Sequence, residues 1–450
     1  MKIVIIGGVA AGAKAAAKSR RMLADAEINL YTQDTHVSYS SCGLPYFIEG
    51  NFDDYKMLLV RSPEEFEDQG VHIHLQNKVI KIIPEYKQIL VEDMVNKKLF
   101  LVDYDKLIIA TGARPFIPNI ENINLKNIFT LRTIEDGIAI KEKMKTSKRV
   151  AIIGGGYIGI ELLEAFVKQG LFVELLEASP YLMPTLDTDM SHVLKNSLES
   201  IRNNRFNIYT GELVTRFLGD NSGIKKVVTA SGLELDVDMA IIASGVKPNV
   251  EIASDAGIKL GKTGAIATDC TMKTNIDDIY ACGDCVEENL LITNTPIWMP
   301  LGSNANKEGR CAAINACGEY DCFEGILGSA VTRCLDFTIS MTGLNERDAA
   351  KLGFDPVSTT VTKSDMVGYM PEAGVLTLKL VADKKTKKLI GGQAIGPVGA
   401  DKRINTLTSA IIAQMTVKDF VGNDLTYAPP YSPTIDPLLN AAESLLKKLN

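Results

Sequence analysis

Two glycine-rich turns restrict the fold of this chain more than any other feature of its sequence. The turn at residues 7–12 (GGVAAG) and the turn at residues 154–159 (GGGYIG) each follow a short apolar segment and open a segment with helical periodicity. A second apolar segment follows each expected helix. Strand–turn–helix–strand units build parallel sheets covered by helices, which predicts an α/β protein with two Rossmann-like, doubly wound nucleotide-binding domains. The expected strands cover residues 2–6, 27–31, 149–153 and 172–176, and the expected helices cover residues 10–22 and 158–169.

The remaining segments predict a third domain. Residues 106–112 (KLIIATG) and 239–245 (MAIIASG) each read as a strand that ends in a tight turn and returns the chain to its own sheet. Beyond about residue 326, alternating strands and a closing helix predict a separate α+β domain. The strands expected there cover residues 330–341, 374–382 and 389–395. The expected domains are residues 1–115 with 246–325, which contain the first turn, residues 116–245, which contain the second, and residues 326–450.

The first turn is suited to a dinucleotide, although it departs from the usual pattern. It keeps the first and last glycines of GxGxxG, Gly7 and Gly12, while Val9 occupies the middle position. Such a turn lets a diphosphate rest on a helix N-terminus. The acidic residue expected after the next strand is replaced by Thr32, and Asp34 follows two residues later.

Two later segments specify which dinucleotide the first turn binds. Residues 110–112 (ATG) follow a predicted strand, and residues 274–284 read as another strand that ends in Gly283 and Asp284. This second segment resembles the FAD fingerprint in which the Asp accepts a hydrogen bond from the ribitol chain. The three pieces occur in the right order, and together they predict FAD.

The second turn carries a complete GxGxxG pattern, formed by Gly154, Gly156 and Gly159. Glu177 ends the next expected strand, where a carboxylate can hold the 2′-hydroxyl of an adenosine ribose. This carboxylate would repel a 2′-phosphate, and residues 178–180 (ASP) supply no cation to neutralise one. The pattern therefore favours NADH over NADPH. The alternative is a turn that only packs a helix against a strand.

Cys42 is the candidate redox residue. Of the eight cysteines, it alone lies in the first half of the chain, within residues 38–46 (SYSSCGLPY), where the chain leaving the second strand is expected to cross the flavin ring. Its neighbours are small and polar, which opposes the alternative of a buried packing cysteine. No CxxxxC pattern occurs here, so Cys42 has no local disulfide partner.

Charge and hydropathy exclude several classes of partner. The net charge is −7 and no dense block of Lys and Arg occurs, so we expect no nucleic-acid surface. No apolar run reaches the roughly 18–20 residues that a membrane span requires. We therefore expect a cytoplasmic protein without a membrane partner.

Taken together, these motifs resemble the single-cysteine branch of the pyridine nucleotide–disulfide oxidoreductases along the whole chain. That branch contains CoA-disulfide reductases, CoA-persulfide/polysulfide reductases, NADH peroxidases and NADH oxidases. The resemblance implies a homodimer that reduces a small disulfide or persulfide. Further motifs that carry it are TLRTIEDG (130–137), NANKEGR (304–310), GADKRI (399–404) and YAPPYSP (427–433).

A few positions discriminate within the branch. Peroxidases and oxidases carry a histidine in the first turn, where this chain has Ala10. CoA-disulfide reductases place two tyrosines near the cysteine, which Tyr369 and Tyr427 match, although Glu372 replaces the usual glycine. Tyr427 is then expected to reach Cys42 of the partner subunit. Because the sequence ends at Asn450 without a rhodanese domain, CoA disulfide is favoured over CoA persulfide or polysulfide, and NADH oxidase is the third alternative.

The resemblance also implies roles for individual side chains. The Cys42 thiolate is expected to be stabilised by the flavin and by a helix N-terminus that lowers the thiol's pKa, and CoA is a candidate mixed-disulfide partner. Cys282 and Cys285 are expected to be packing residues. The further cofactor-binding positions are Ser41, Val79, Ala110, Thr111, Gly112, Arg132, Tyr157, Ile158, Glu161, Gly245, Gly302 and Ser303. Candidates for the CoA phosphates, unless they are simply solvated, are Lys14, Lys18, Arg20, Arg21 and Arg61.

Overall fold

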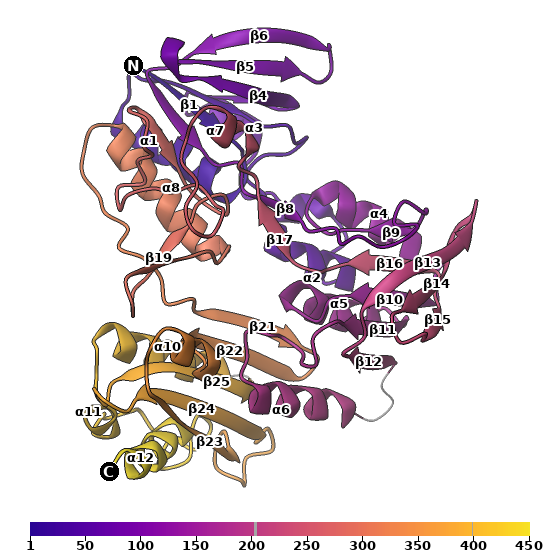
Figure 1. The fold of residues 1–450 in the computed structure, drawn as a ribbon, viewed down its shortest axis with the longest axis vertical. Coiled ribbons are helices and arrows are strands. Elements are labelled where there is room, and N and C mark those ends of the chain that lie inside the picture. Colours follow the sequence, from indigo (N-terminus) through magenta and orange to yellow (C-terminus); the bar gives the residue numbers. More distant parts are fainter. Residues whose placement is uncertain (202–204, 398) are drawn as a thin grey trace.

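The first nucleotide unit forms a parallel sheet in the order β18-β7-β1-β2-β3 (Figure 1). The computed structural model describes residues 1–201, 205–397 and 399–450. Helix α1 lies along α8, and a Cβ at Gly309 would sit 2.3 Å from the Ala11 carbonyl oxygen, so glycine allows this close approach. The elements are β1 (Lys2–Ile6), α1 (Ala10–Met22), β2 (Glu27–Tyr31), β3 (Val71–His74), β7 (Lys106–Ile109), β18 (Ile279–Ala281) and α8 (Gly302–Ala316).

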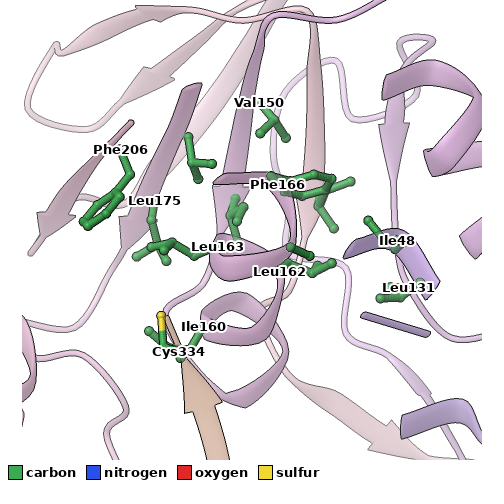
Figure 2. Packing of buried hydrophobic residues seen from close by; sticks show 14 of the residues in the cluster. Ile48, Leu131, Val150, Ile160, Leu162, Leu163, Phe166, Leu175, Phe206 and Cys334 are labelled. Carbon is green, nitrogen blue, oxygen red and sulfur yellow. The ribbon is translucent and has the colours of Figure 1, made fainter. Parts of the chain in front are cut away.

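The second nucleotide unit forms another parallel sheet, in the order β12-β11-β10-β16-β9. Its central helix α5 packs apolar side chains on two sides. Figure 2 shows this packing: Leu163 points toward the sheet around Leu175, while Leu162 points toward Ile48 of α2 (Leu44–Glu49). The elements are β9 (Ile128–Phe129), α4 (Ile134–Met144), β10 (Arg149–Ile153), α5 (Tyr157–Lys168), β11 (Phe172–Glu177), α6 (Thr188–Glu199), β12 (Phe206–Thr210) and β16 (Met239–Ile242).

The C-terminal part forms an antiparallel sheet in the order β21-β22-β25-β24-β23, packed against α10 and α12. The fold class is therefore the predicted one, α/β with a C-terminal α+β part. The elements are β21 (Ala330–Cys334), β22 (Phe337–Gly343), α9 (Glu346–Lys351), β23 (Pro356–Ser364), β24 (Val375–Asp383), β25 (Leu389–Gly396), α10 (Ala400–Ile412), α11 (Val417–Val421) and α12 (Pro437–Leu449).

Two strand predictions were wrong. The single strand expected over residues 330–341 is a hairpin, because Leu335 takes a left-handed conformation (φ 54°) and reverses the chain between β21 and β22. The strand expected over residues 274–284 is reduced to β18, because Asp278 is also left-handed (φ 66°) and the Thr274 hydroxyl closes a turn by donating to the Ile279 carbonyl at 2.9 Å. The left-handed position at Leu335 carries neither Gly nor Asn, whereas the turn over residues 274–279 contains Asn275, Asp277 and Asp278, a signal that sequence reasoning overlooked.

Smaller elements join these three units. One layer, β4-β5-β6, lies beyond the first sheet in Figure 1, and two short strands, β8 and β17, pair where the chain passes between the first and second units. No helix within the described ranges is long and apolar enough to cross a membrane. The remaining elements are α2 (Leu44–Glu49), α3 (Pro63–Glu67), β4 (Asn77–Ile83), β5 (Gln88–Asp93), β6 (Lys98–Asp103), β8 (Ala113–Pro115), β13 (Val214–Asp220), β14 (Gly223–Thr229), β15 (Glu234–Asp236), β17 (Val246–Pro248), α7 (Glu251–Asp255), β19 (Glu288–Leu290) and β20 (Thr295–Ile297).

Candidate active site

A single cavity of about 1640 Å³ extends from the first glycine turn to the second. Most of the predicted site residues line it, although they come from segments far apart in the sequence. Gly12, Gly159, Tyr369 and Tyr427 are not among its lining residues. The predicted residues that line the cavity are Gly7, Thr32, Ser41, Cys42, Val79, Ala110, Thr111, Gly112, Arg132, Gly154, Gly156, Tyr157, Ile158, Glu161, Glu177, Gly245, Gly283, Asp284, Gly302 and Ser303.

The first turn is built for close backbone contact. Gly7 has a φ of +102°, and a Cβ there would lie 2.1 Å from the Ala110 carbonyl oxygen. A Cβ at Gly12 would lie 1.9 Å from the Gly7 carbonyl oxygen. Only glycine fits both positions, and the turn places the N-terminus of α1 at the cavity wall. This is the arrangement that a dinucleotide diphosphate requires, so the residues present fit FAD.

The second turn repeats this geometry. A Cβ at Gly154 (φ +118°) would lie 2.4 Å from the Ala243 carbonyl oxygen, and a Cβ at Gly159 would lie 2.0 Å from that of Gly154. Gly156, in contrast, faces open space, with no atom within 4 Å of a built Cβ. Gly154 and Gly159 are therefore needed for packing, and Gly156 leaves room at the N-terminus of α5.

Each turn is followed by an acidic group at the cavity wall. One Glu177 carboxylate oxygen accepts the Gly155 N–H and the other accepts the Ser179 N–H, both at 2.7 Å. In the first unit, the Asp34 N–H donates to the Thr32 hydroxyl at 3.2 Å, and burial raises the pKa of the Asp34 carboxyl group. Asp34 thus lies beside Thr32 in the cavity. From the sequence, Asp34 was noted only as an acidic residue two positions after the expected one.

Cys42 lies in a short 3₁₀ turn (Ser41–Gly43) before α2, and its side chain is exposed to the cavity. A Cβ built on Gly302, the first residue of α8, would lie 3.8 Å from the Cys42 Sγ. The prediction of a lowered thiol pKa was wrong for the protein alone. The protein atoms around the cavity desolvate the thiol and raise the pKa of Cys42, and the Glu161 carboxylate raises it further. The neighbouring Ser41 and Arg132 act in the opposite direction but do not offset this.

Asp284 and Arg132 form an ion pair at the cavity wall. The Arg132 Nη2 lies 3.3 Å from an Asp284 carboxylate oxygen. The Trp298 indole N–H donates to the Asp284 carbonyl at 2.9 Å, and Gly283 is left-handed (φ 80°). These contacts fix the Gly-Asp turn from two sides, with the carboxylate facing the cavity as an FAD ribitol chain would require.

Sequence reasoning missed two buried carboxyl groups beneath that turn. The Gly283 N–H donates to a Glu308 carboxyl oxygen at 2.6 Å, and the Met299 N–H donates to Glu288 at 3.0 Å. Both side chains are almost fully buried and hydrogen-bond to each other. Burial raises the pKa of both carboxyl groups, and the charge of Glu288 raises the pKa of Glu308 further. The pair therefore retains a proton. Glu308 had been noted only as part of the NANKEGR motif.

The C-terminal sheet supports the second cofactor helix. The Thr332 hydroxyl of β21 donates to Glu161 at 2.9 Å, and the Tyr157 hydroxyl lies 3.3 Å from the Met341 sulfur of β22. Burial raises the pKa of the Glu161 carboxyl group. Below this contact, four charged groups link α2, α5 and β21, and they are Glu49, Glu164, Lys168 and Arg333.

The predicted tyrosines lie apart from Cys42 within one chain. The Tyr369 and Tyr427 side chains are 74% and 49% exposed, and they stand on two loops of the C-terminal part. Arg403 joins these loops: its guanidinium pairs with Asp436 at 3.0 Å and donates to the Asp365 carbonyl at 2.8 Å.

The basic residues suggested for CoA are not at the cavity wall in the described part of the chain. The Arg20 guanidinium donates to the backbone carbonyls of Ala26 and Leu23, at 2.7 and 3.3 Å, so it holds the end of α1 and is not free for a ligand. The CxxC pair is buried, and the Cys285 thiol donates to the Cys282 carbonyl at 3.3 Å, in agreement with a packing role.

Comparison with known proteins identifies related sequences along most of the chain. Residues 1–309 match the family model described as pyridine nucleotide-disulphide oxidoreductase, and residues 330–438 match the dimerisation domain of that family. An NAD(P)H coenzyme A polysulfide/persulfide reductase from Pyrococcus horikoshii is 37% identical over 450 residues, covering 99% of this chain and 98% of that protein. A coenzyme A disulfide reductase from Staphylococcus aureus is 30% identical over 437 residues, covering 96% of each.

Among solved structures, an NAD-dependent persulfide reductase from A. fulgidus superposes with a TM-score of 0.96 at 35% identity. The match covers 100% of this chain and 83% of that one. The Pyrococcus relative is matched over 98% of its length, so a protein named for polysulfide and persulfide needs no large additional domain. This overturns the sequence-based reason for ranking those substrates below CoA disulfide.

Proposed function

The chain belongs to the pyridine nucleotide-disulphide oxidoreductase family, and on that premise we propose that it uses NADH to reduce a sulfur–sulfur bond in a small CoA-linked substrate at Cys42. One observation carries the proposal. The Cys42 thiol opens into the same cavity as both glycine turns, so one space can hold two nucleotides and a reactive sulfur.

The two turns would divide the nucleotides between them. The Gly7 turn, Asp34 and Asp284 would hold FAD, and the Gly154 turn and Glu177 would hold NADH. When bound, FAD supplies two-electron transfer between a nicotinamide and a sulfur atom. Glu177 favours NADH, because a 2′-phosphate would meet a carboxylate that two backbone N–H groups already hold in place.

Cys42 would carry out the sulfur chemistry by thiol–disulfide exchange. Its thiolate attacks one sulfur of the substrate, forms a mixed disulfide and releases the other sulfur as a thiolate. Two electrons that originate from NADH, with one proton, then cleave the mixed disulfide and return Cys42 as a thiolate and the small thiol. Since the surrounding protein raises the pKa of Cys42, the nearby Arg132 and Ser41 would be needed to keep part of it ionised.

Tyr369 and Tyr427 would act from the other subunit of a homodimer. Both are exposed on the part of the chain that matches the family's dimerisation domain. A phenol near the mixed disulfide can protonate the leaving thiolate. This arrangement accounts for two exposed tyrosines on loops that Arg403 holds together.

CoA persulfide or polysulfide is the first substrate candidate, supported by the Pyrococcus relative at 37% identity. CoA disulfide is the second, supported by Tyr369, Tyr427 and the Staphylococcus relative at 30% identity. The thiol–disulfide exchange at Cys42 is the same for both substrates, because each presents a sulfur–sulfur bond.

The test is the rate of NADH oxidation by the FAD-loaded enzyme with CoA persulfide, polysulfide, CoA disulfide and oxygen as separate acceptors. We expect turnover with one of the sulfur acceptors that exceeds turnover with oxygen. A matched variant, Cys317→Ser, alters a cysteine outside the cavity lining and should keep this turnover. Turnover with oxygen alone would overturn the proposal.

A further inference from the structure

Two cysteines outside the cavity lie opposite each other on neighbouring surface segments. The Phe323 N–H donates to the Cys270 carbonyl oxygen at 2.7 Å. Cys270 lies in a turn that the Met272 N–H closes by donating to the Asp269 carbonyl at 3.0 Å. The Phe323 bond ties this turn to the backbone directly after Cys322, which brings the two cysteines side by side. A disulfide requires Cα atoms about 4.4–6.8 Å apart, a range that such neighbours can reach.

The side chains also point toward each other. The Cys270 and Cys322 thiols and the Tyr320 hydroxyl lie close enough together to shift one another's pKa. Cys270 is exposed and Cys322 is half-buried, so a small molecule can reach the pair from solvent. Contact with Cys270 raises the pKa of Cys322.

The segment that carries Cys322 is fixed to the end of α8. The Asn315 amide donates to the Asp321 carbonyl at 2.7 Å, and the Arg310 guanidinium pairs with the Asp321 carboxylate at 3.2 Å. Buried Cys311 donates its thiol proton to backbone carbonyls of both segments, at 3.5 Å to Cys270 and 3.4 Å to Asp321. Closure of a Cys270–Cys322 bond thus needs little backbone movement.

We propose that Cys270 and Cys322 form a second redox-active thiol pair, which low-molecular-weight disulfides oxidise directly. The Cys270 thiolate attacks the small disulfide, forms a mixed disulfide and releases one small thiol. Cys322 then attacks the Cys270 sulfur and releases the second small thiol. Two thiols of the protein become one disulfide, and one small disulfide becomes two thiols, so the electrons balance. An excess of small thiol reverses the reaction.

The pair acts without the catalytic cysteine. Neither Cys270 nor Cys322 is among the residues that line the cavity, so exchange occurs at the surface with solvent-borne disulfide. The proposal therefore does not depend on the function proposed for Cys42, and the two can fail separately.

The test is peptide mapping of the FAD-loaded enzyme after oxidation with CoA disulfide, with N-ethylmaleimide used to block the remaining thiols. We expect a cross-linked peptide containing Cys270 and Cys322, both in the wild type and in Cys42→Ser, and its loss after dithiothreitol. Cys322→Ser should instead retain a CoA adduct on Cys270, because no second thiol displaces it. The control Cys317→Ser should form the cross-link normally.

Two outcomes would overturn the proposal. One is that N-ethylmaleimide still labels both Cys270 and Cys322 after an oxidant treatment that modifies other exposed thiols, because both thiols would then have stayed reduced. The other is a cross-link that forms in the wild type but not in Cys42→Ser, because oxidation would then proceed through the active site.

Discussion

The buried carboxyl pair beneath the Gly283 turn makes the stability of this enzyme depend on pH near neutrality. Glu288 and Glu308 are 8% and 1% exposed, and among the described ion pairs none places a Lys or Arg on either. When both ionise, two like charges share a site of low polarity. Burial raises the pKa of Glu288 from 4.5 to about 7. One pKa unit corresponds to about 1.4 kcal/mol, so ionising the buried Glu288 costs about 3 kcal/mol.

The sign of this effect follows from proton binding. Between the ordinary pKa of Glu and the raised value in the folded protein, the folded state binds more protons than the unfolded state. The contribution of the protonated Glu288 to folding stability is fully present below about pH 4.5 and is lost as the pH rises through about 7. Glu308→Gln keeps an oxygen to accept the Gly283 N–H and removes one of the two ionisable groups, so it should reduce this loss, while the part caused by burial of Glu288 remains.

The assay is the urea midpoint of the FAD-loaded protein, measured from pH 5 to pH 9 for the wild type, Glu308→Gln and a control. The control is Glu319→Gln, which changes an exposed carboxylate near the end of the same helix. We expect the wild type and the control to lose stability together between pH 5 and 8, while Glu308→Gln loses less. Parallel curves for all three proteins would refute the reasoning.

Three further predictions concern the cofactor, the subunit contact and the ion pairs around Glu164. Glu177→Ala removes the group proposed for the ribose hydroxyl, and it should raise the KM for NADH about tenfold or more while leaving the KM for NADPH nearly unchanged in steady-state assays. Tyr427→Phe should lower sulfur-dependent turnover about 10- to 100-fold, and unchanged single-turnover reduction by NADH in a stopped-flow assay would separate it from a folding defect. Arg333→Met should lower the urea midpoint by the equivalent of about 1–2 kcal/mol, because Glu164 is buried; the half-exposed guanidinium limits the loss, and an unchanged midpoint would contradict the role given to Lys168 and Arg333.

The sequence was sufficient for the nucleotide units because their signals are local. Residues 10–22 were expected to be helical and form α1 (Ala10–Met22), and residues 2–6 form β1. In both cases a glycine turn separates an apolar strand from a helix, so periodicity and turn chemistry agree. The parallel pairing then follows from the connection through a helix.

The remaining features depend on tertiary contacts. The reversal at Leu335 has neither Gly nor Asn at its left-handed position. Strand β23 (Pro356–Ser364) is a polar strand at the edge of its sheet, which hydropathy does not mark. The Glu288–Glu308 pair and the Cys270–Cys322 pair are each formed by residues from separate segments. The raised pKa of Cys42 likewise depends on burial by other segments and on the carboxylates of Glu161 and Asp284, which are far from Cys42 in the sequence.

The central claim is that Cys42 is the sulfur that reacts with the substrate. It is tested most directly by the rate of NADH oxidation in Cys42→Ser, using whichever sulfur acceptor the wild type reduces fastest. FAD content is measured in the same preparation, and Cys317→Ser serves as the matched cysteine control. We predict that Cys42→Ser binds FAD normally, while its sulfur-dependent rate falls to the background measured without enzyme. A variant that retains FAD and reduces the sulfur acceptor at the wild-type rate would contradict the account.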